Sequence, residues 1–462
     1  MLTKNINNKT SSVQGGKIYG DFTSSFHSDI RMYSEDIDVS IAYSKMLKKI
    51  GILSSQESEL IKNSLEEIRK EIKDNIFDWD YTLEDIHLNI ENSMYKKIGE
   101  VAGKLHYGRS RNDQVATDSR LYFLRNVDLI IPSIIKFLEV LIKLSEKNIE
   151  ILLPGYTHLQ KGQPILISHN LMSYFSMISR DLSRFQNTRF NLDNMPLGSG
   201  AFAGVTIPLD RDLLADELGF SRVSSNSIDS VSSRDHITDL LYSCSSIMIN
   251  LSRISEELII WNTEEFNFIN IPDEFTTGSS IMPQKRNPDY FELIRGKSGI
   301  PIGHLVSLFT SLKGLTFTYN RDLQEDRKGA MDSIEIVSQS LEVLSNLFSN
   351  LTFNQKIMLD SAHNSNILAT DFADYLANKK MPYREAYEIV KNISSSLEGK
   401  YIHQISLNEL RKFSKLFEED VLDISLGNSI ERRNSFGGTS TDSVKNQIKE
   451  AKIFLLKIKN EK

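Results

Sequence analysis

Long stretches without proline are the feature that most constrains the fold of this chain. Only ten prolines occur in 462 residues, and several of the intervening segments carry apolar residues three and four positions apart, which is the spacing of one helix face. The clearest segments are 127–149, 237–261 and 331–351. Each would extend about 30 Å as a continuous helix, and helices of this length predict a bundle.

Strand patterns are scarce by comparison. Short β-favouring pieces such as 205–209 lie beside glycine or proline, and strands do not alternate with helices as they would in a parallel sheet. We therefore predict an all-α protein. Polar stretches near 108–113 and 361–365 divide it into an N-terminal helical domain (1–111), a central long-helix bundle (112–363) and a C-terminal helical domain (364–462).

The charge and composition argue against several classes of partner. The chain has 54 Lys and Arg against 61 Asp and Glu, a formal charge of −7, so it lacks the basic field that nucleic-acid binding requires. No uninterrupted apolar stretch of about 18 residues predicts a membrane span, and the first residues lack the apolar core of a secretory signal. We expect a cytoplasmic protein. Its single cysteine, Cys244, lies in an apolar helical segment and is expected in the core.

The segment 276–295, TTGSSIMPQKRNPDYFELIR, joins a Gly/Ser-rich loop to a predicted helix start. Asn287 is the expected N-cap, and Pro288 suits the first helical turn. Lys285 and Arg286 stand directly before this cap, so two cations and free amide groups would gather there, as in an anion site. The alternative is an ordinary helix cap beside two solvated basic side chains.

Two further polar segments lie next to predicted helices. In 108–118 (GRSRNDQVATD), Ser110 and Asp113 have the spacing of a capping box beside two arginines, so a carboxylate site and a capped helix with exposed arginines both remain open. In 154–164 (PGYTHLQKGQP), His158 lies in a constrained turn between prolines and glycines. Histidine is the side chain that changes charge near neutral pH, although a lone histidine is more often structural.

Metal and cofactor signatures are missing from the sequence. His87 has no second histidine at helical spacing, and neither HExxH nor a Cys/His cluster occurs. The glycine patterns of phosphate-binding loops and dinucleotide-binding folds are absent, as is the GxSxG nucleophile elbow. We therefore expect chemistry on a small polar anion without a metal or cofactor.

Taken together, these segments resemble the fumarase/aspartase superfamily and, within it, the argininosuccinate lyases. The resemblance rests on GSSIMPQKRNPD (278–289), GKLHYGRSRNDQVATD (103–118) and GYTHLQKGQP (155–164), and it extends to EDIHLNIE, PLGSGAFAG, NSIDSVSSRD and YNRDLQED. The QKRNPD ending and the GRSRNDQ segment distinguish the lyases from fumarases and aspartases. The resemblance covers the chain from about residue 13 to its end.

The resemblance implies an all-helical, three-domain subunit whose central helices form the core of a homotetramer, with each active site built by three subunits. It also implies the reversible β-elimination of argininosuccinate to L-arginine and fumarate, the last step of arginine biosynthesis. In this reaction a proton leaves the carbon next to a carboxylate, and the guanidinium nitrogen departs from the neighbouring carbon. The site therefore needs a base, an acid and cations that stabilise the carbanion.

The same resemblance implies roles for individual residues. Ser279 is the base and His158 the general acid, with Glu292 supporting the imidazole and Lys285 the negative charge. The fumarate side of the substrate is expected to contact Ser110, Asn112, Thr157, Lys285 and Asn287, and Arg111 and Gln160 are further candidate ligands. The arginine side is expected to contact Ser40, Tyr319, Gln324 and Arg327.

Four residues depart from the family pattern. Tyr107 replaces a threonine, Gly162 an alanine, Ser233 an acid and Arg327 a lysine. Arginine keeps the charge but changes the geometry, and Lys328 could substitute. Two alternatives stay open: a lyase of the same superfamily that acts on another succinyl-amino compound, and a non-catalytic relative like the lens crystallins of this family. The intact catalytic residues count against the second.

Overall fold

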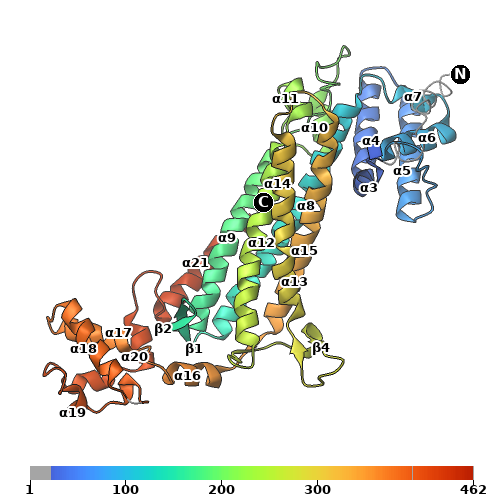
Figure 1. The fold of residues 1–462 in the computed structure, drawn as a ribbon. Coiled ribbons are helices and arrows are strands. Elements are labelled where there is room, and N and C mark those ends of the chain that lie inside the picture. The colour runs from blue at the N-terminus through green and yellow to red at the C-terminus, as the bar shows by residue number, and fades with distance from the viewer. Residues whose placement is uncertain (1–21, 398, 461–462) are drawn as a thin grey trace. The chain divides into compact units, whose positions relative to one another are not determined.

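The structure, a computed structural model, describes residues 22–397 and 399–460. The chain forms two compact units. Unit 1 contains the described residues up to Ile130 together with Arg184–Ser245 and Ile300–Glu335, and unit 2 contains Ile131–Ser183, Ser246–Gly299 and the described residues from Ile336 onwards. Residues of both units belong to four long helices, which are α8 (Arg111–Lys147), α9 (Ile167–Leu192), α12 (Asp235–Asn262) and α15 (Arg327–Asn350) (Figure 1).

The three long helices predicted from apolar spacing are confirmed. The segments 237–261 and 331–351 correspond to α12 and α15, and 127–149 forms the second half of α8. Helix α8 starts earlier than predicted and continues through Pro132. The all-α prediction is correct for the main elements, but the described part of the chain also contains three short antiparallel ladders.

Unit 1 contains the first helices of the described chain. Helix α5 begins at a capping box in which the Ser54 hydroxyl accepts the amide of Glu57, while the Glu57 carboxylate accepts the amide of Ser54. This helix packs against α4 and α6 through fully buried residues such as Leu65 and Ile68. The elements wholly in this unit, apart from the first residue of α14, are α3 (Phe26–Asp29), η1 (Ile30–Met32), α4 (Tyr33–Lys49), α5 (Ser55–Lys73), α6 (Ile86–Ile98), α7 (Val101–Lys104), α10 (Arg211–Leu218), α11 (Ser227–Ser232), α14 (Gly299–Leu312) and η3 (Arg321–Asp326).

Unit 2 combines a β-hairpin, two minimal ladders and a C-terminal group of helices. Helices α17 and α18 pack against each other around a buried cluster that includes Phe372, Leu376 and Phe417. The strands are β1 (Leu152–Thr157), β2 (Gln160–Leu166), β3 (Ile269–Asn270), β4 (Thr277–Gly278), β5 (Arg286–Asn287) and β6 (Thr352–Phe353). The helices wholly in this unit are η2 (Asp273–Phe275), α13 (Asp289–Lys297), α16 (Gln355–His363), α17 (Ala369–Asn378), α18 (Tyr383–Ser395), η4 (Ile402–Gln404), α19 (Leu407–Leu410), η5 (Glu419–Asp423), α20 (Leu426–Arg432) and α21 (Thr441–Asn460).

Two smaller sequence predictions can be compared with these elements. Cys244 is a free, buried thiol within α12, as expected. The β-favouring piece 205–209 forms no strand; the strands lie elsewhere. None of the helices in the described part of the chain combines the length and the apolar character that crossing a membrane requires.

Aromatic packing inside unit 2 gives a test of what holds its long helices together. Phe348 of α15 is fully buried, and its ring lies 5.3 Å from that of Phe137 in α8 and 6.3 Å from that of Tyr174 in α9. Phe348→Ala would leave a cavity at this junction, so we expect it to lower the free energy of unfolding by about 3–5 kcal/mol in urea denaturation. Phe436→Ala, at a fully exposed ring, is the control; equal losses in the two variants would contradict this packing account.

Candidate active site

The predicted site residues divide evenly between the two units. Ser40, Ser110, Arg111, Asn112, Tyr319, Gln324 and Arg327 belong to unit 1, and Thr157, His158, Gln160, Ser279, Lys285, Asn287 and Glu292 belong to unit 2.

In unit 1, the turn 110–112, where α8 begins, has two hydrogen bonds of the kind found at a helix N-terminus. The amide of Ser110 donates to the carboxylate of Asp113 at 3.0 Å, and the amide of Asn112 donates to the Ser110 hydroxyl at 3.3 Å. One bond of the predicted capping box is therefore confirmed, the bond from the Ser110 amide to the Asp113 carboxylate. Ser110 and Asn112 remain partly exposed, which leaves their side chains accessible at a helix N-terminus, where anions are favoured.

Other polar side chains surround this turn. Arg111 donates to Gln114 at 2.8 Å and lies 3.4 Å from the carboxylate of Asp85. Arg109 donates to the hydroxyl of Ser40 at 3.0 Å. Ser40 is almost fully buried and lies beside the arginine-rich turn, whereas the resemblance implies a contact with the arginine side of the substrate.

The segment around η3 carries the other predicted ligands of unit 1. Tyr319 is partly exposed, and burial of its ring raises the pKa of its hydroxyl. The side-chain amide of Gln324 donates to the carbonyl of Thr23 at 3.1 Å. Both residues lie in the segment that leads into α15, which begins at Arg327.

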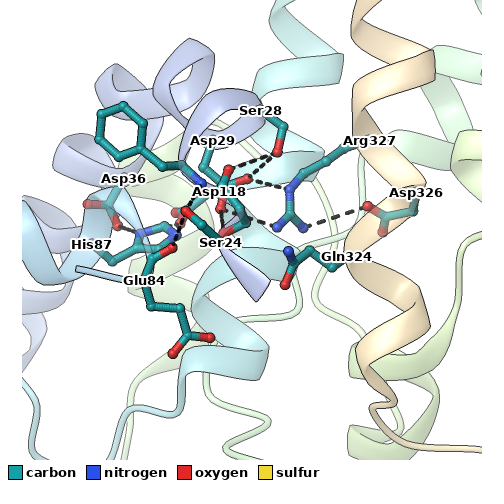
Figure 2. A network of polar contacts seen from close by, with 12 residues as sticks. Ser24, Ser28, Asp29, Asp36, Glu84, His87, Asp118, Gln324, Asp326 and Arg327 are labelled. Carbon is teal, nitrogen blue, oxygen red and sulfur yellow. Dashed lines mark hydrogen bonds and ion pairs between the residues drawn. The ribbon is translucent and has the colours of Figure 1, made fainter. Parts of the chain in front are cut away.

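Arg327 is held in a buried ion pair. Its guanidinium donates to both carboxylate oxygens of Asp29, at 2.6 and 3.2 Å, and a third nitrogen lies 3.6 Å from Asp326 (Figure 2). Burial opposes the charge of Arg327, but the two carboxylates outweigh burial and raise the pKa of the guanidinium. Arginine suits this position because its planar fork matches a carboxylate, which a lysine cannot do with two parallel bonds. Its predicted contact with substrate stays a prediction.

A buried acid–histidine cluster in unit 1 was not predicted from the sequence. Nδ1 of His87 lies 2.8 Å from a carboxylate oxygen of Asp36 and 3.7 Å from one of Asp118 (Figure 2). Gln114 also donates to Asp36. Local sequence cannot show this cluster, because Asp36 lies 51 residues from His87 in the chain.

The pKa values of the two carboxyl groups in this cluster are shifted in opposite directions. Burial opposes ionisation of Asp36, but His87, Arg109 and Arg111 outweigh it and lower the pKa of this carboxyl. Burial and the nearby Asp36 raise the pKa of Asp118 well above its usual value. The ligand atoms of the three residues lie within 4.8 Å of one another, as a small cation would need. However, the hydrogen bond between His87 and Asp36 already uses two of these atoms, and the two guanidinium charges disfavour a further cation.

In unit 2, His158 lies at the tip of the hairpin formed by β1 and β2. The predicted turn is confirmed, and the strands beside it were not predicted. Thr157 pairs with Gln160 across the end of the ladder, and His158 and Leu159 both have positive φ, 55° and 56°, as a tight two-residue hairpin turn requires. A non-glycine residue seldom adopts this conformation, and such strain concentrates at functional sites. Thr157, His158 and Gln160 are all exposed.

The Gly/Ser loop of unit 2 is closed by the ladder of β4 and β5. Thr277 pairs with Asn287, and the loop between the strands carries Ser279 and Lys285. The Ser279 hydroxyl oxygen accepts the amides of Ile281 at 3.3 Å and of Met282 at 3.1 Å. Two backbone donors on one oxygen stabilise negative charge on it.

The helix start after this loop differs from the prediction. Asn287 is not the N-cap; it belongs to β5, and Pro288 holds the cap position of α13. Because the ladder extends through Asn287, the helix can begin only after it. Glu292 follows in the first turn of α13 and is exposed, as is Lys285. Within 22–397 and 399–460, no hydrogen bond or ion pair joins His158 to Glu292.

Comparison with known proteins identifies the family. The profile of a lyase family matches residues 10–303, and the profile described as argininosuccinate lyase C-terminal matches residues 366–430. The argininosuccinate lyase of Bacillus cereus is 44% identical over 435 residues, which cover 94% of each chain. That of Carboxydothermus hydrogenoformans is also 44% identical, over 94% of this chain and 95% of the relative.

Solved structures agree on the fold. EDDS lyase in complex with formate is 27% identical, with a TM-score of 0.82 over 92% of this chain and 86% of its own. The class II fumarase of Schistosoma mansoni, at 16% identity, covers 85% of this chain and 90% of its own with a TM-score of 0.72, and supports the fold alone. The expected fumarase-like helical architecture is thus confirmed. The chain belongs to the argininosuccinate lyase family, a family of carbon–nitrogen lyases within the fumarase/aspartase superfamily.

Proposed function

We propose that this chain catalyses the reversible elimination of argininosuccinate to L-arginine and fumarate, with Ser279 as the base. The observation that carries the proposal is the pair of backbone amides on the Ser279 oxygen. A serine hydroxyl is a weak base, and it becomes a stronger one where donors and a nearby cation stabilise its alkoxide. Lys285, on the same loop, supplies that cation.

The reaction needs two proton transfers. Ser279 removes a proton from the carbon next to a carboxylate, and the resulting carbanion spreads its charge into that carboxylate. His158 then protonates the departing guanidinium nitrogen as a general acid. The exposed position of His158 at the hairpin tip suits this task, and Glu292 would support the imidazolium from the first turn of α13.

The proposed binding roles follow from the donor groups that each of these segments presents. The turn 110–112 and the hairpin tip present hydroxyl, amide and guanidinium donors, and Lys285 and Asn287 add two more donors for the fumarate-side carboxylates. Tyr319 and Gln324 are assigned to the arginine side. Arg327 contributes to that side through its charge while it remains paired with Asp29.

We further propose a homotetramer in which each active site combines loops of several subunits. Half of the predicted site residues belong to unit 1 and half to unit 2. In a symmetric assembly, each equivalent interface brings the same residues together. The division into domains at 1–111, 112–363 and 364–462, the absence of a cofactor requirement and the cytoplasmic location remain predictions.

A fumarate-release assay tests the activity. We expect the ultraviolet absorbance of fumarate to rise when the purified protein receives argininosuccinate, but not when it receives adenylosuccinate, malate or aspartate. Release only from another succinyl-amino compound would retain the elimination and change the substrate. The similarity to EDDS lyase makes EDDS the first such compound to include. Release from none of them would contradict the proposal and favour a non-catalytic relative.

A matched pair of loop variants tests the base. Ser279→Ala removes the proposed proton acceptor, so we expect turnover to fall by about 10²-fold or more while substrate binding persists. Ser280→Ala changes the neighbouring hydroxyl, which accepts neither amide, and should keep turnover within about threefold. Steady-state fumarate release and calorimetric binding give both quantities. Turnover of Ser279→Ala within about tenfold of the wild type would rule out the assignment.

A further inference from the structure

A buried carboxylate joins two loops of unit 1. Asp113, in the first turn of α8, is fully buried. One of its oxygens accepts the amide of Ser110 at 3.0 Å. The other accepts the amides of Gly198 at 3.0 Å and Gly200 at 2.8 Å. The carboxylate of Asp113 therefore accepts hydrogen bonds from both the turn 110–112 and the loop 198–201.

The loop is shaped for this contact by its glycines. Gly198 and Gly200 have φ of 91° and 62°, which L side chains rarely adopt. A Cβ at Gly200 would lie 2.7 Å from the carbonyl oxygen of Gly204. Arg211 holds the loop from another side, since its Nε donates to the carbonyl of Leu197 at 2.8 Å. The two glycine amides are thus fixed in their direction toward the carboxylate.

A second bond ties the same two segments together. The side-chain amide of Asn112 donates to the carbonyl of Ala201 at 3.1 Å. Because the amide of Asn112 also donates to the Ser110 hydroxyl, both proposed ligands in this turn depend on the loop 198–201 for their orientation.

Keeping a carboxylate at this position costs free energy. Burial raises the pKa of Asp113 to about 6, although three backbone amides and Arg109 act against that rise. A neutral side chain would avoid the cost of burying a charge. The carboxylate is the side chain that can accept three amides from two separate segments, since it has acceptors only.

We propose that Asp113 is a positioning residue that fixes Ser110 and Asn112 for the fumarate-side carboxylate of the substrate. It touches no substrate itself. It acts by holding the turn 110–112 against the loop 198–201, so that the Ser110 hydroxyl and the Asn112 side chain are arranged before the anion binds. The inference rests on the proposed function of this turn and adds a residue to which the resemblance assigned no role.

The reverse reaction tests this role, because fumarate and arginine then enter as separate substrates. Asp113→Asn replaces one acceptor oxygen with an NH2 group, which cannot accept an amide. We expect the KM for fumarate to rise about tenfold or more, while the KM for arginine stays within about threefold. Asp371→Asn is the control, since Asp371 is also buried and accepts the Ser429 hydroxyl at 2.9 Å, but belongs to unit 2 and has no part in the turn. It should change neither value.

A glycine pair tests the same contact from the other loop and keeps the inference testable if Asp113→Asn does not fold. Gly198→Ala strains a residue that donates to Asp113 and should raise the KM for fumarate selectively. Gly204→Ala strains a residue three positions after the loop 198–201, with φ of 81° and open space around it, and should not. Equal rises in both KM values, or no rise in either Asp113→Asn or Gly198→Ala, would overturn the inference.

Failure of the proposed function can be recognised separately. If the wild-type protein does not join fumarate to arginine, the proposed function fails, and calorimetric binding of fumarate to the same variants then decides the positioning role. Weaker binding in Asp113→Asn and Gly198→Ala than in their controls supports it, and unchanged binding refutes it.

Discussion

The apolar faces of the long helices are the constraint on which the rest of the structure depends. A helix pairs its own backbone N–H and C=O groups in hydrogen bonds. Helices α8, α9, α12 and α15 can therefore bury these faces without leaving backbone polar groups unpaired. The groups that can bind an anion are therefore left to the connections. The proposed fumarate-side ligands lie at the start of α8, in the hairpin between α8 and α9, and in the loop between α12 and α13.

Each connection is held by a different set of contacts. The hairpin tip is held by its ladder, which keeps His158 at positive φ. The Ser279 loop is closed by β4 and β5, and its own amides bind the serine oxygen. In unit 1, two buried carboxylates hold these segments. Asp113 accepts a hydrogen bond from the turn 110–112, and Asp29 accepts hydrogen bonds from Arg327. Pre-arranged donors of this kind are what a developing carbanion requires, because they need no reorganisation during the reaction.

The local spacing of apolar and polar residues predicted the long helices and the polar segments, since both depend on residues close in sequence. It missed β1 and β2 because Pro154, Gly155 and Pro164 argue against strands. It placed the cap of α13 at Asn287 because the pairing of β5 with β4 is not visible locally. The contact of Arg327 with Asp29 spans 298 residues and that of His87 with Asp36 spans 51. No periodicity carries such information, so the support behind the candidate site could be seen only in the fold.

Mixed assemblies give the most direct test of a lyase site built from several chains. Ser279→Ala and Asn112→Leu chains with different tags can be co-expressed and purified through both tags, so that each assembly contains both variants. If loops of unit 1 and unit 2 meet across subunits, some sites combine an intact Ser279 with an intact Asn112, and fumarate release returns although each variant alone is inactive. Doubly tagged assemblies that release no fumarate would contradict the shared site.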